Sequence, residues 1–277
     1  MPELPEVETV TQALKEVGLN WTITKIDFFR KDLRESIPIE EFKKILLNCS
    51  IIEIKRRSKY ILIFSHKGCG IFHLGMSGSF LSRKDAETKV PHTHLIMRLS
   101  KRGSRSRFLH FVDPRRFGRI GAVVLNNYEN HPFLRNLGPE PLELPRLGDY
   151  LYEKSRKSSR AIKTFLMDAK NIVGLGNIYV CESLYQARIS PFRAAGQVSR
   201  KEFQLLGNAI KKTLRKAIKQ GGTTLKDFKN TEGNPGYFKV SLKVYGRTGL
   251  ACENCKDSIT LAKQSGRSSW FCSFCQK

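Results

Sequence analysis

Hydrophobic residues follow two different periods along this chain of 277 residues, and the changes between them divide it into regions. Near the start they recur every three or four positions, at Val7, Val10, Leu14 and Val17. That spacing predicts one buried face of an α-helix. Pro5 suits the first turn, where a missing N–H costs nothing, and Gly18 suits the end. We therefore expect a first helix from about Pro5 to Gly18.

Short runs rich in β-branched and aromatic residues come next, separated by glycines and charged turns. The runs are Trp21–Phe29, Ile51–Arg57, Tyr60–Phe64, Ile71–His73, Ser79–Leu81, Leu95–Leu99, Phe108–Val112 and Arg119–Leu125. Many short strands at this spacing predict an antiparallel sandwich.

The pattern changes again after about residue 130. Residues 137–148 carry three prolines and little periodicity, which indicates a linker. Helical spacing then returns in Ala161–Ala169 and Tyr179–Ala187, on either side of a glycine-rich turn at residues 173–177.

A longer helix is expected to open at Ser199, because Ser199 and Glu202 match a capping box, and to end at Gly221–Gly222. The following segment, Thr223–Phe238, is polar and contains glycine and proline. It is either a surface connection or a loop that closes over a ligand. The run Lys239–Tyr245 is strand-like and leads into the last region of the chain.

The charge balance narrows the possible partners. Lysine and arginine number 49 against 25 acidic residues, giving a formal charge of +24. Such an excess attracts phosphates over long distances, so nucleic acid is favoured over a surface selected only for solubility. No apolar run is long enough to cross a bilayer, and the acidic, proline-punctuated start is no signal peptide.

The last region contains Cys252-x2-Cys255 and, after sixteen residues, Cys272-x2-Cys275. Two such pairs predict one tetrahedral zinc site. A module of about 30 residues cannot bury enough apolar surface to fold alone, so the metal replaces a core. Four cysteine ligands leave no open position, which makes the zinc structural. The other cysteines (Cys49, Cys69 and Cys181) are expected to be buried apolar residues.

The start of the chain offers a nucleophile. Removal of Met1 would leave Pro2 as a terminal secondary amine. An α-amine has a pKa of about 7.7–8.0, so part of it is unprotonated at neutral pH and can attack an electrophilic carbon. Glu3 and Glu6 lie beside it and suit acid–base assistance. The alternative is that both simply complement the positive end of the first helix.

Blocks along nearly the whole chain resemble the formamidopyrimidine-DNA glycosylase family of bacterial base-excision repair. They are Met1–Thr9, Arg56–Tyr60, His73–Gly78, Asp113–Gly118, Gly174–Tyr179, Gly221–Leu225, Tyr245–Arg247 and the cysteine pairs. The resemblance implies an α+β fold. An N-terminal antiparallel β-sandwich with flanking helices precedes a helix–two-turn–helix domain and a β-hairpin zinc finger. The expected boundaries are a catalytic domain at 1–135, a linker at 136–152, a DNA-binding domain at 153–238 and a zinc finger at 239–277.

The resemblance also implies roles for individual residues. Pro2 is expected to attack C1′ of the damaged nucleotide, and Glu3 to protonate the opening sugar and manage later proton transfers. Glu6 is expected to organise the site, and Lys59 to grip a phosphate beside the lesion and assist catalysis. The expected DNA contacts are His73, Asn177 and Arg267 on backbone phosphates, Met76, Arg115 and Phe117 in the gap left by an everted base, and Lys163 near the lesion pocket. Eversion is needed because C1′ is inaccessible in a stacked duplex, and apolar side chains can wedge the gap.

Five of these DNA contacts have a simpler alternative. Met76 and Phe117 could be core residues, His73 a core histidine, Asn177 a helix cap and Arg115 half of a weak surface ion pair.

By resemblance, the expected function is a bifunctional DNA glycosylase and abasic-site lyase. It removes oxidised purines (8-oxoguanine and formamidopyrimidines) from duplex DNA through a Schiff base at Pro2 and β,δ-elimination. The expected cofactor is one structural Zn²⁺, with no organic cofactor. Double-stranded DNA with oxidised bases is the expected partner of a monomer that uses no membrane and works in the bacterial cytoplasm at the nucleoid.

Three other functions remain open at this point. The chain could be an endonuclease VIII-type glycosylase for oxidised pyrimidines, although Leu4 and the 221–238 segment favour the purine branch. It could be a non-catalytic damaged-DNA-binding homologue, although Pro2, Glu3 and Lys59 argue against that. An RNA-binding zinc-ribbon protein would leave the first residues unexplained.

Overall fold

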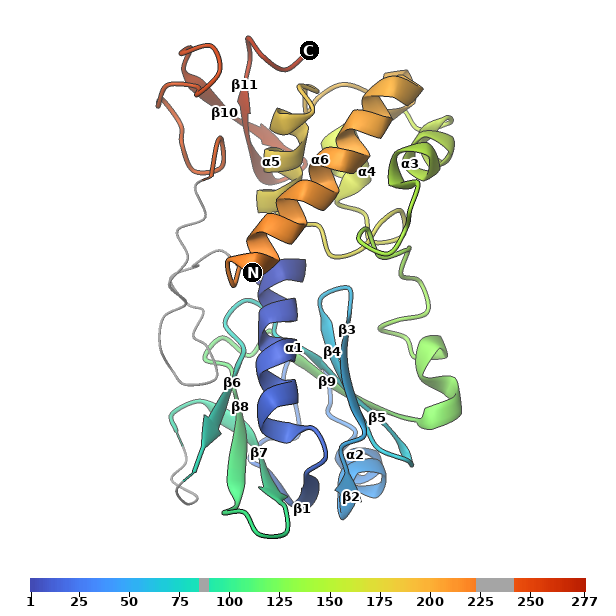
Figure 1. Ribbon diagram of the computed structural model, residues 1–277, viewed down its shortest axis with the longest axis vertical. Coiled ribbons are helices and arrows are strands. Elements are labelled where there is room, and N and C mark those ends of the chain that lie inside the picture. Colours follow the sequence, from blue (N-terminus) through green and yellow to red (C-terminus); the bar gives the residue numbers. More distant parts are fainter. Residues whose placement is uncertain (85–89, 223–241) are drawn as a thin grey trace. The chain divides into compact units, whose positions relative to one another are not determined.

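The computed structural model describes residues 1–84, 90–222 and 242–277, and the statements below concern these residues. They form two compact units, one made of 1–135 with 221–222 and the other of 136–220 with 242–277 (Figure 1). The loop expected at Thr223–Phe238, and with it any contact to a lesion, lies outside the described residues.

The first unit is a sandwich of two antiparallel sheets. One sheet has the order β2-β1-β7-β8-β6, and the other has the order β3-β4-β5-β9. The strands of the first sheet are β1 (Thr22–Phe28), β2 (Cys49–Ser50), β6 (Ser79–Arg83), β7 (Thr93–Ser100) and β8 (Arg107–Val112). Those of the second are β3 (Glu53–Arg57), β4 (Tyr60–Phe64), β5 (Gly68–His73) and β9 (Arg119–Val124). The predicted antiparallel sandwich is confirmed.

Apolar side chains from both sheets fill the space between them. Phe72 of β5 is fully buried, and its ring centroid lies 5.0 Å from that of Phe80 and 5.7 Å from that of Phe111. Because strand side chains alternate between faces, β7 contributes every second residue to this core, namely Leu95, Met97 and Leu99. The core fixes the ends of β5 and β8, from which two loops with predicted site residues start.

Two helices cover the open sides of the sandwich. The first, α1 (Leu4–Gly18), confirms the predicted helix and contacts the edge strands β3 and β6. The second, α2 (Ile39–Leu46), contacts the edge strands β2 and β9. The sequence analysis did not predict α2, although the apolar residues of this helix fall at helical spacing. Phe42 of α2 packs edge-on against Phe72. A short 3-10 helix, η1 (Leu125–Asn130), follows β9.

The second unit is built around helices. Its helices are α3 (Leu147–Ser155), α4 (Ile162–Leu166), α5 (Asn177–Gln186), the 3-10 turn η2 (Ala195–Gln197) and α6 (Arg200–Lys219). The expected capping box at the start of α6 is present, since Ser199 N–H donates to Glu202 at 2.8 Å and Glu202 N–H donates to the Ser199 hydroxyl at 3.3 Å. Helix α3 begins inside the segment expected to be a linker, because Leu147 and Leu151 are buried.

A β-hairpin completes the second unit. Strands β10 (Ile259–Gln264) and β11 (Arg267–Cys272) pair antiparallel across the two-residue turn Ser265–Gly266. Both turn residues have positive φ, which matches the twist of a tight hairpin. The strand expected at Lys239–Tyr245 is not found in its described part, residues 242–245, which form bends and a turn. Within the described part of the chain, no helix has the length and apolar character that crossing a membrane requires.

Candidate active site and metal centre

The predicted catalytic residues Pro2, Glu3 and Glu6 lie together, buried, at the start of α1. The backbone N–H of Glu3 donates to the Glu6 carboxylate at 2.8 Å, so Glu6 fixes the backbone on which Glu3 stands. Both acidic residues lie at the N-terminal end of α1, where acidic side chains complement the helix dipole. In the unprocessed chain Met1 precedes Pro2, so the Pro2 nitrogen is an amide and becomes a nucleophilic amine only once Met1 is removed.

Gly222, the second residue of the predicted glycine pair, lies against Glu6. Gly222 has a φ of +87°, and a Cβ built on it would lie 2.9 Å from a carboxylate oxygen of Glu6. A side chain at this position would therefore push directly on the carboxylate that holds Glu3. This close approach explains why the turn needs glycine there.

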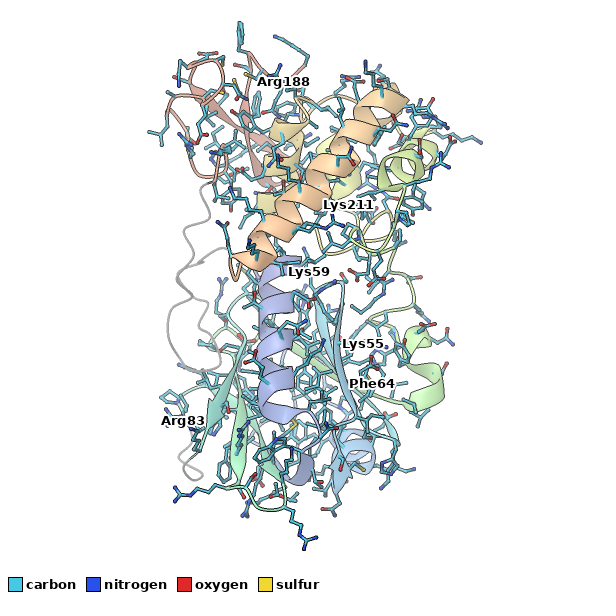
Figure 2. All side chains as sticks on the ribbon, in the orientation of Figure 1. Lys55, Lys59, Phe64, Arg83, Arg188 and Lys211 are labelled. Atoms are coloured by element: carbon cyan, nitrogen blue, oxygen red, sulfur yellow. The ribbon has the colours of Figure 1, made fainter. Side chains whose placement is uncertain are left out.

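Lys59 lies in the two-residue turn between β3 and β4, next to α1 (Figure 2). Ser58, the other residue of the turn, has a φ of +57°. Arg56 braces the turn, because its guanidinium donates to the Ser58 carbonyl at 3.0 Å and to Glu8 of α1 at 2.7 Å. The helix that carries Pro2 and the hairpin that carries Lys59 are thus joined by a partly buried ion pair.

His73, at the end of β5, is neutral at physiological pH. Burial, together with the positive charges of Lys59, Arg119 and Arg34, lowers the pKa of its ring to about 4. The Gly75 N–H donates to Nδ1 at 3.0 Å, so the ring proton stays on Nε2. His73 therefore offers one N–H donor among three cations, an arrangement that suits a phosphate oxygen.

Met76, Arg115 and Phe117 stand on two adjoining loops that follow β5 and β8. Met76 is 37% exposed and Phe117 is 40% exposed, so neither is a core residue and that alternative is wrong. The Arg115 guanidinium lies 5.0 Å from the centre of the Phe117 ring. Gly75 has a φ of +63°, and a Cβ on it would lie 2.4 Å from the Phe117 carbonyl carbon, so the two loops touch through their backbones.

In the second unit, Lys163 and Asn177 both bind the zinc-module hairpin. The buried Lys163 amine donates to the Ser268 carbonyl and to the Ser269 hydroxyl, each at 2.7 Å. The Asn177 amide donates to the same Ser268 carbonyl at 3.0 Å. The cap of α5 is Gly176, so the suggestion that Asn177 caps this helix is wrong. Both side chains fix the strand on which the exposed Arg267 stands.

The four predicted zinc ligands come together at the base of that hairpin. The sulfurs of Cys252, Cys255, Cys272 and Cys275 all lie within 4.8 Å of one another. The Cys252 and Cys275 sulfurs are 3.9 Å apart and those of Cys255 and Cys272 are 3.4 Å apart, close to the roughly 3.8 Å expected for Zn–S bonds of about 2.3 Å. Within residues 1–84, 90–222 and 242–277 this is the only group of His, Cys, Asp or Glu side chains that could share a metal ion.

Helix α5 supports the zinc site with two side chains that the sequence analysis did not identify. The buried Tyr185 hydroxyl lies 3.1 Å from the Cys252 sulfur. Burial raises the pKa of Cys252, but the hydrogen bonds from Tyr185 and the backbone outweigh it and lower that pKa to about 6, which favours the thiolate that zinc binds. One turn earlier, the buried Glu182 accepts the backbone N–H groups of residues 243–245 at 2.9–3.1 Å.

The structure thus gathers the predicted residues into two groups. Pro2, Glu3, Glu6, Lys59, His73 and the Met76–Arg115–Phe117 loops belong to the first unit, and Lys163, Asn177, Arg267 and the cysteines belong to the second. The supporting residues that were missed reach partners far along the chain, so sequence spacing gives no signal for them. Asp113, whose carboxylate accepts the Ser77 hydroxyl and the Gly118 N–H, stood inside a family block, but nothing in the sequence indicated these hydrogen bonds.

Known proteins resemble this chain over its whole length. A family model for the formamidopyrimidine-DNA glycosylase N-terminal domain matches residues 1–120, and one for the formamidopyrimidine-DNA glycosylase H2TH domain matches residues 137–229. The formamidopyrimidine-DNA glycosylase of Ruthia magnifica is 44% identical over 279 residues, with 100% of both chains covered. That of Stenotrophomonas maltophilia is 44% identical over 277 residues, again with 100% of both covered.

Solved structures show the same fold. The MutM (Fpg) protein of Thermus thermophilus superposes with a TM-score of 0.86 at 34% identity, over 99% of this chain and 98% of that one. A MutM complex with DNA containing carbocyclic 8-oxo-G gives a TM-score of 0.88 at 33% identity, with 100% of both chains covered. The chain belongs to the formamidopyrimidine-DNA glycosylase family.

Proposed function

We propose that this protein is a bifunctional DNA glycosylase and abasic-site lyase that removes oxidised purines from duplex DNA. The observation that carries the proposal is the buried cluster of Pro2, Glu3 and Glu6 at the start of α1, with the Lys59 turn tied to the same helix. The related structures support the substrate class. One is a MutM bound to DNA with carbocyclic 8-oxo-G, and another is a Lactococcus lactis Fpg mutant bound to DNA with Fapy-dG.

The first chemical step joins the protein to the sugar. After Met1 is removed, the Pro2 amine attacks C1′ of the everted nucleotide; a C–N bond forms to Pro2, and the bond from C1′ to the base breaks with its electron pair leaving on the base. Glu3, as a carboxylate, takes the proton that the Pro2 nitrogen carries after the attack and passes it to the ring oxygen O4′ as the C1′–O4′ bond breaks, which leaves an iminium ion between Pro2 and C1′. The departing base takes a proton from water. Glu6 holds the Glu3 backbone for this transfer.

Strand cleavage follows from the imine. The positive nitrogen withdraws electrons and makes a C2′ hydrogen acidic, so loss of that proton expels the 3′ phosphate. A second elimination expels the 5′ phosphate, and hydrolysis of the imine then releases the enzyme. Lys59 and the neutral His73 are the groups in the first unit that we assign to the flanking phosphates, since one supplies a charge and the other supplies an Nε2–H donor.

DNA recognition uses exposed side chains held by buried ones. Met76 and Phe117 supply apolar surface for the gap left by the everted nucleotide, and Arg115 supplies donors for the base left behind. Arg267 is assigned to a backbone phosphate, with Lys163 and Asn177 holding its strand. Cys252, Cys255, Cys272 and Cys275 would hold a zinc ion that stabilises this hairpin, and four thiolate ligands would leave no coordination position open for the reaction. Because the substrate is chromosomal DNA, we assign the protein to the bacterial nucleoid.

A lesion panel tests the proposal against its nearest rival. Purified protein that has lost Met1 is incubated separately with duplexes that contain 8-oxoguanine, formamidopyrimidine or thymine glycol, and the rate of cleavage of each is measured. Faster cleavage of the oxidised purines supports the proposal. Equal or faster cleavage of thymine glycol would assign the chain to the pyrimidine branch, and binding without cleavage would make it a damaged-DNA-binding protein.

A further inference from the structure

Asp113, at the end of β8, is fully buried and connects the two loops that carry Met76, Arg115 and Phe117. We call residues 74–78 the Met76 loop and residues 113–118 the Arg115 loop. One carboxylate oxygen of Asp113 accepts the Ser77 hydroxyl at 2.6 Å, and the other accepts the Gly118 N–H at 2.7 Å. A single side chain therefore holds a residue next to Met76 and a residue next to Phe117.

Ser77 completes the link. While its hydroxyl donates to Asp113, its oxygen accepts the backbone N–H of Arg115 at 3.2 Å. The three hydrogen bonds thus reach Arg115 itself and the neighbours of the two other exposed side chains. The loops also approach each other closely through the backbones of Gly75 and Phe117.

Burying a carboxylate is costly unless its hydrogen bonds are satisfied. Both donors to Asp113 are neutral groups, a hydroxyl and a backbone N–H. The two hydrogen bonds offset the cost of burying Asp113, and an apolar side chain in its place would leave the Ser77 hydroxyl and the Gly118 N–H without an acceptor. Because the two bonds run to different loops, the geometry fits the ordering of two loops whose tips carry solvent-exposed hydrophobic side chains.

We propose that Asp113 is a positioning residue that holds Met76, Arg115 and Phe117 as one rigid wedge before DNA is bound. This inference rests on the proposed function, in which these side chains fill the gap left by the everted nucleotide. A wedge ordered in advance pays no ordering entropy when the base leaves the stack. Loosening the hydrogen bonds of Asp113 therefore slows eversion from a duplex and leaves the chemistry at Pro2 intact.

Two variants and two substrates test the proposal. Asp113→Asn keeps the shape of the side chain, but it can no longer accept both hydrogen bonds. Ser77→Ala removes the link to Arg115 and leaves the Gly118 bond in place, so it tests the same claim if Asp113→Asn does not fold. Ser106→Ala, which removes a hydroxyl bonded to Arg98, is the matched control.

Single-turnover rates are measured on a duplex with 8-oxoguanine, which requires eversion, and on a single-stranded abasic oligonucleotide, which does not. We expect both variants to slow base release from the duplex by about 10- to 100-fold, the effect of small misplacements in a reacting complex. In both variants, strand cleavage at the single-stranded abasic site should change by less than about twofold, because this substrate does not need the wedge. The control variant Ser106→Ala should change neither rate.

Two results would overturn the inference: unchanged base release from the duplex, or equal losses on both substrates, which would show a general support of the fold. A fluorescent adenine analogue placed opposite the lesion reports the disturbed base stack directly. In both variants, the rate at which its fluorescence changes should fall together with the rate of base release. If the wild-type protein acts on neither substrate, the proposed function fails, which is a different result from a failure confined to the variants.

Discussion

Replacement of Glu182 should release the zinc module from helix α5. The Glu182 carboxylate is buried and accepts three backbone N–H groups, those of Lys243, Val244 and Tyr245, at 2.9–3.1 Å. These residues lead directly into the module that contains Cys252. In Glu182→Ala all three donors lose their acceptor.

The size of the effect follows from those three donors. A buried donor left without an acceptor costs about 1–3 kcal/mol. The low end of this range applies because Lys243 and Tyr245 are only partly buried, so water can replace the carboxylate there. Loss of the acceptor for three donors therefore destabilises the closed module by about 3 kcal/mol, which corresponds to roughly a 100-fold rise in the population of the open module. Glu182→Gln keeps one oxygen acceptor, so we expect a loss of about 1 kcal/mol and roughly a fivefold rise.

The assay is the rate of zinc release to an excess of a chelating dye, because the module must open before its thiolates let the metal go. Glu253→Gln is the matched control, since Glu253 is an exposed carboxylate of the same module that pairs with Lys243 and Arg247. Surface pairs contribute about 0–1 kcal/mol, so its release rate should stay within a few-fold of the wild-type rate. Zinc release from Glu182→Ala at the wild-type rate would refute the reasoning, and so would an equal effect of Glu253→Gln.

Two further predictions concern single atoms and protons. Tyr185→Phe removes the hydroxyl that lies 3.1 Å from the Cys252 sulfur. We expect its zinc affinity to fall about 10- to 100-fold, the usual effect of losing such a supporting hydrogen bond. Unchanged zinc affinity in a competition titration would contradict this prediction. His73 has its pKa lowered to about 4 in the folded protein, so between that value and the usual 6.5 the unfolded chain binds a proton that the folded chain does not. The stability of the wild-type protein should therefore fall as pH drops through this window, and urea unfolding of His73→Gln should show a shallower fall; identical slopes would argue against a neutral His73.

Local pattern predicted the elements of this fold better than it predicted the contacts of the site. The strand at Tyr60–Phe64 has the expected bounds, and the first helix begins one residue before the expected start at Pro5, because both depend on neighbouring residues. The four cysteines meet as their spacing predicts, since each pair comes from one tight turn.

The local sequence pattern does not predict contacts between residues that lie far apart in the chain. Asn177 was open to interpretation as a helix cap because its neighbours are a glycine-rich turn and a helix, yet its partner Ser268 lies 91 residues away. Asp113 reaches Ser77 across 36 residues, and Glu182 reaches Lys243 across 61. Such partners are set by how the sheets and helices pack, and the period of apolar residues along one element carries no information about them.

The most direct test of the account is covalent capture. Protein lacking Met1 is mixed with an 8-oxoguanine duplex in the presence of borohydride, which reduces an imine to a stable amine, and the adduct is digested and mapped by mass spectrometry. We predict a protein–DNA adduct whose modified atom is the Pro2 nitrogen, and no adduct when Met1 is retained. An adduct on a lysine such as Lys59, or none at all from protein with a free Pro2, would contradict the central claim.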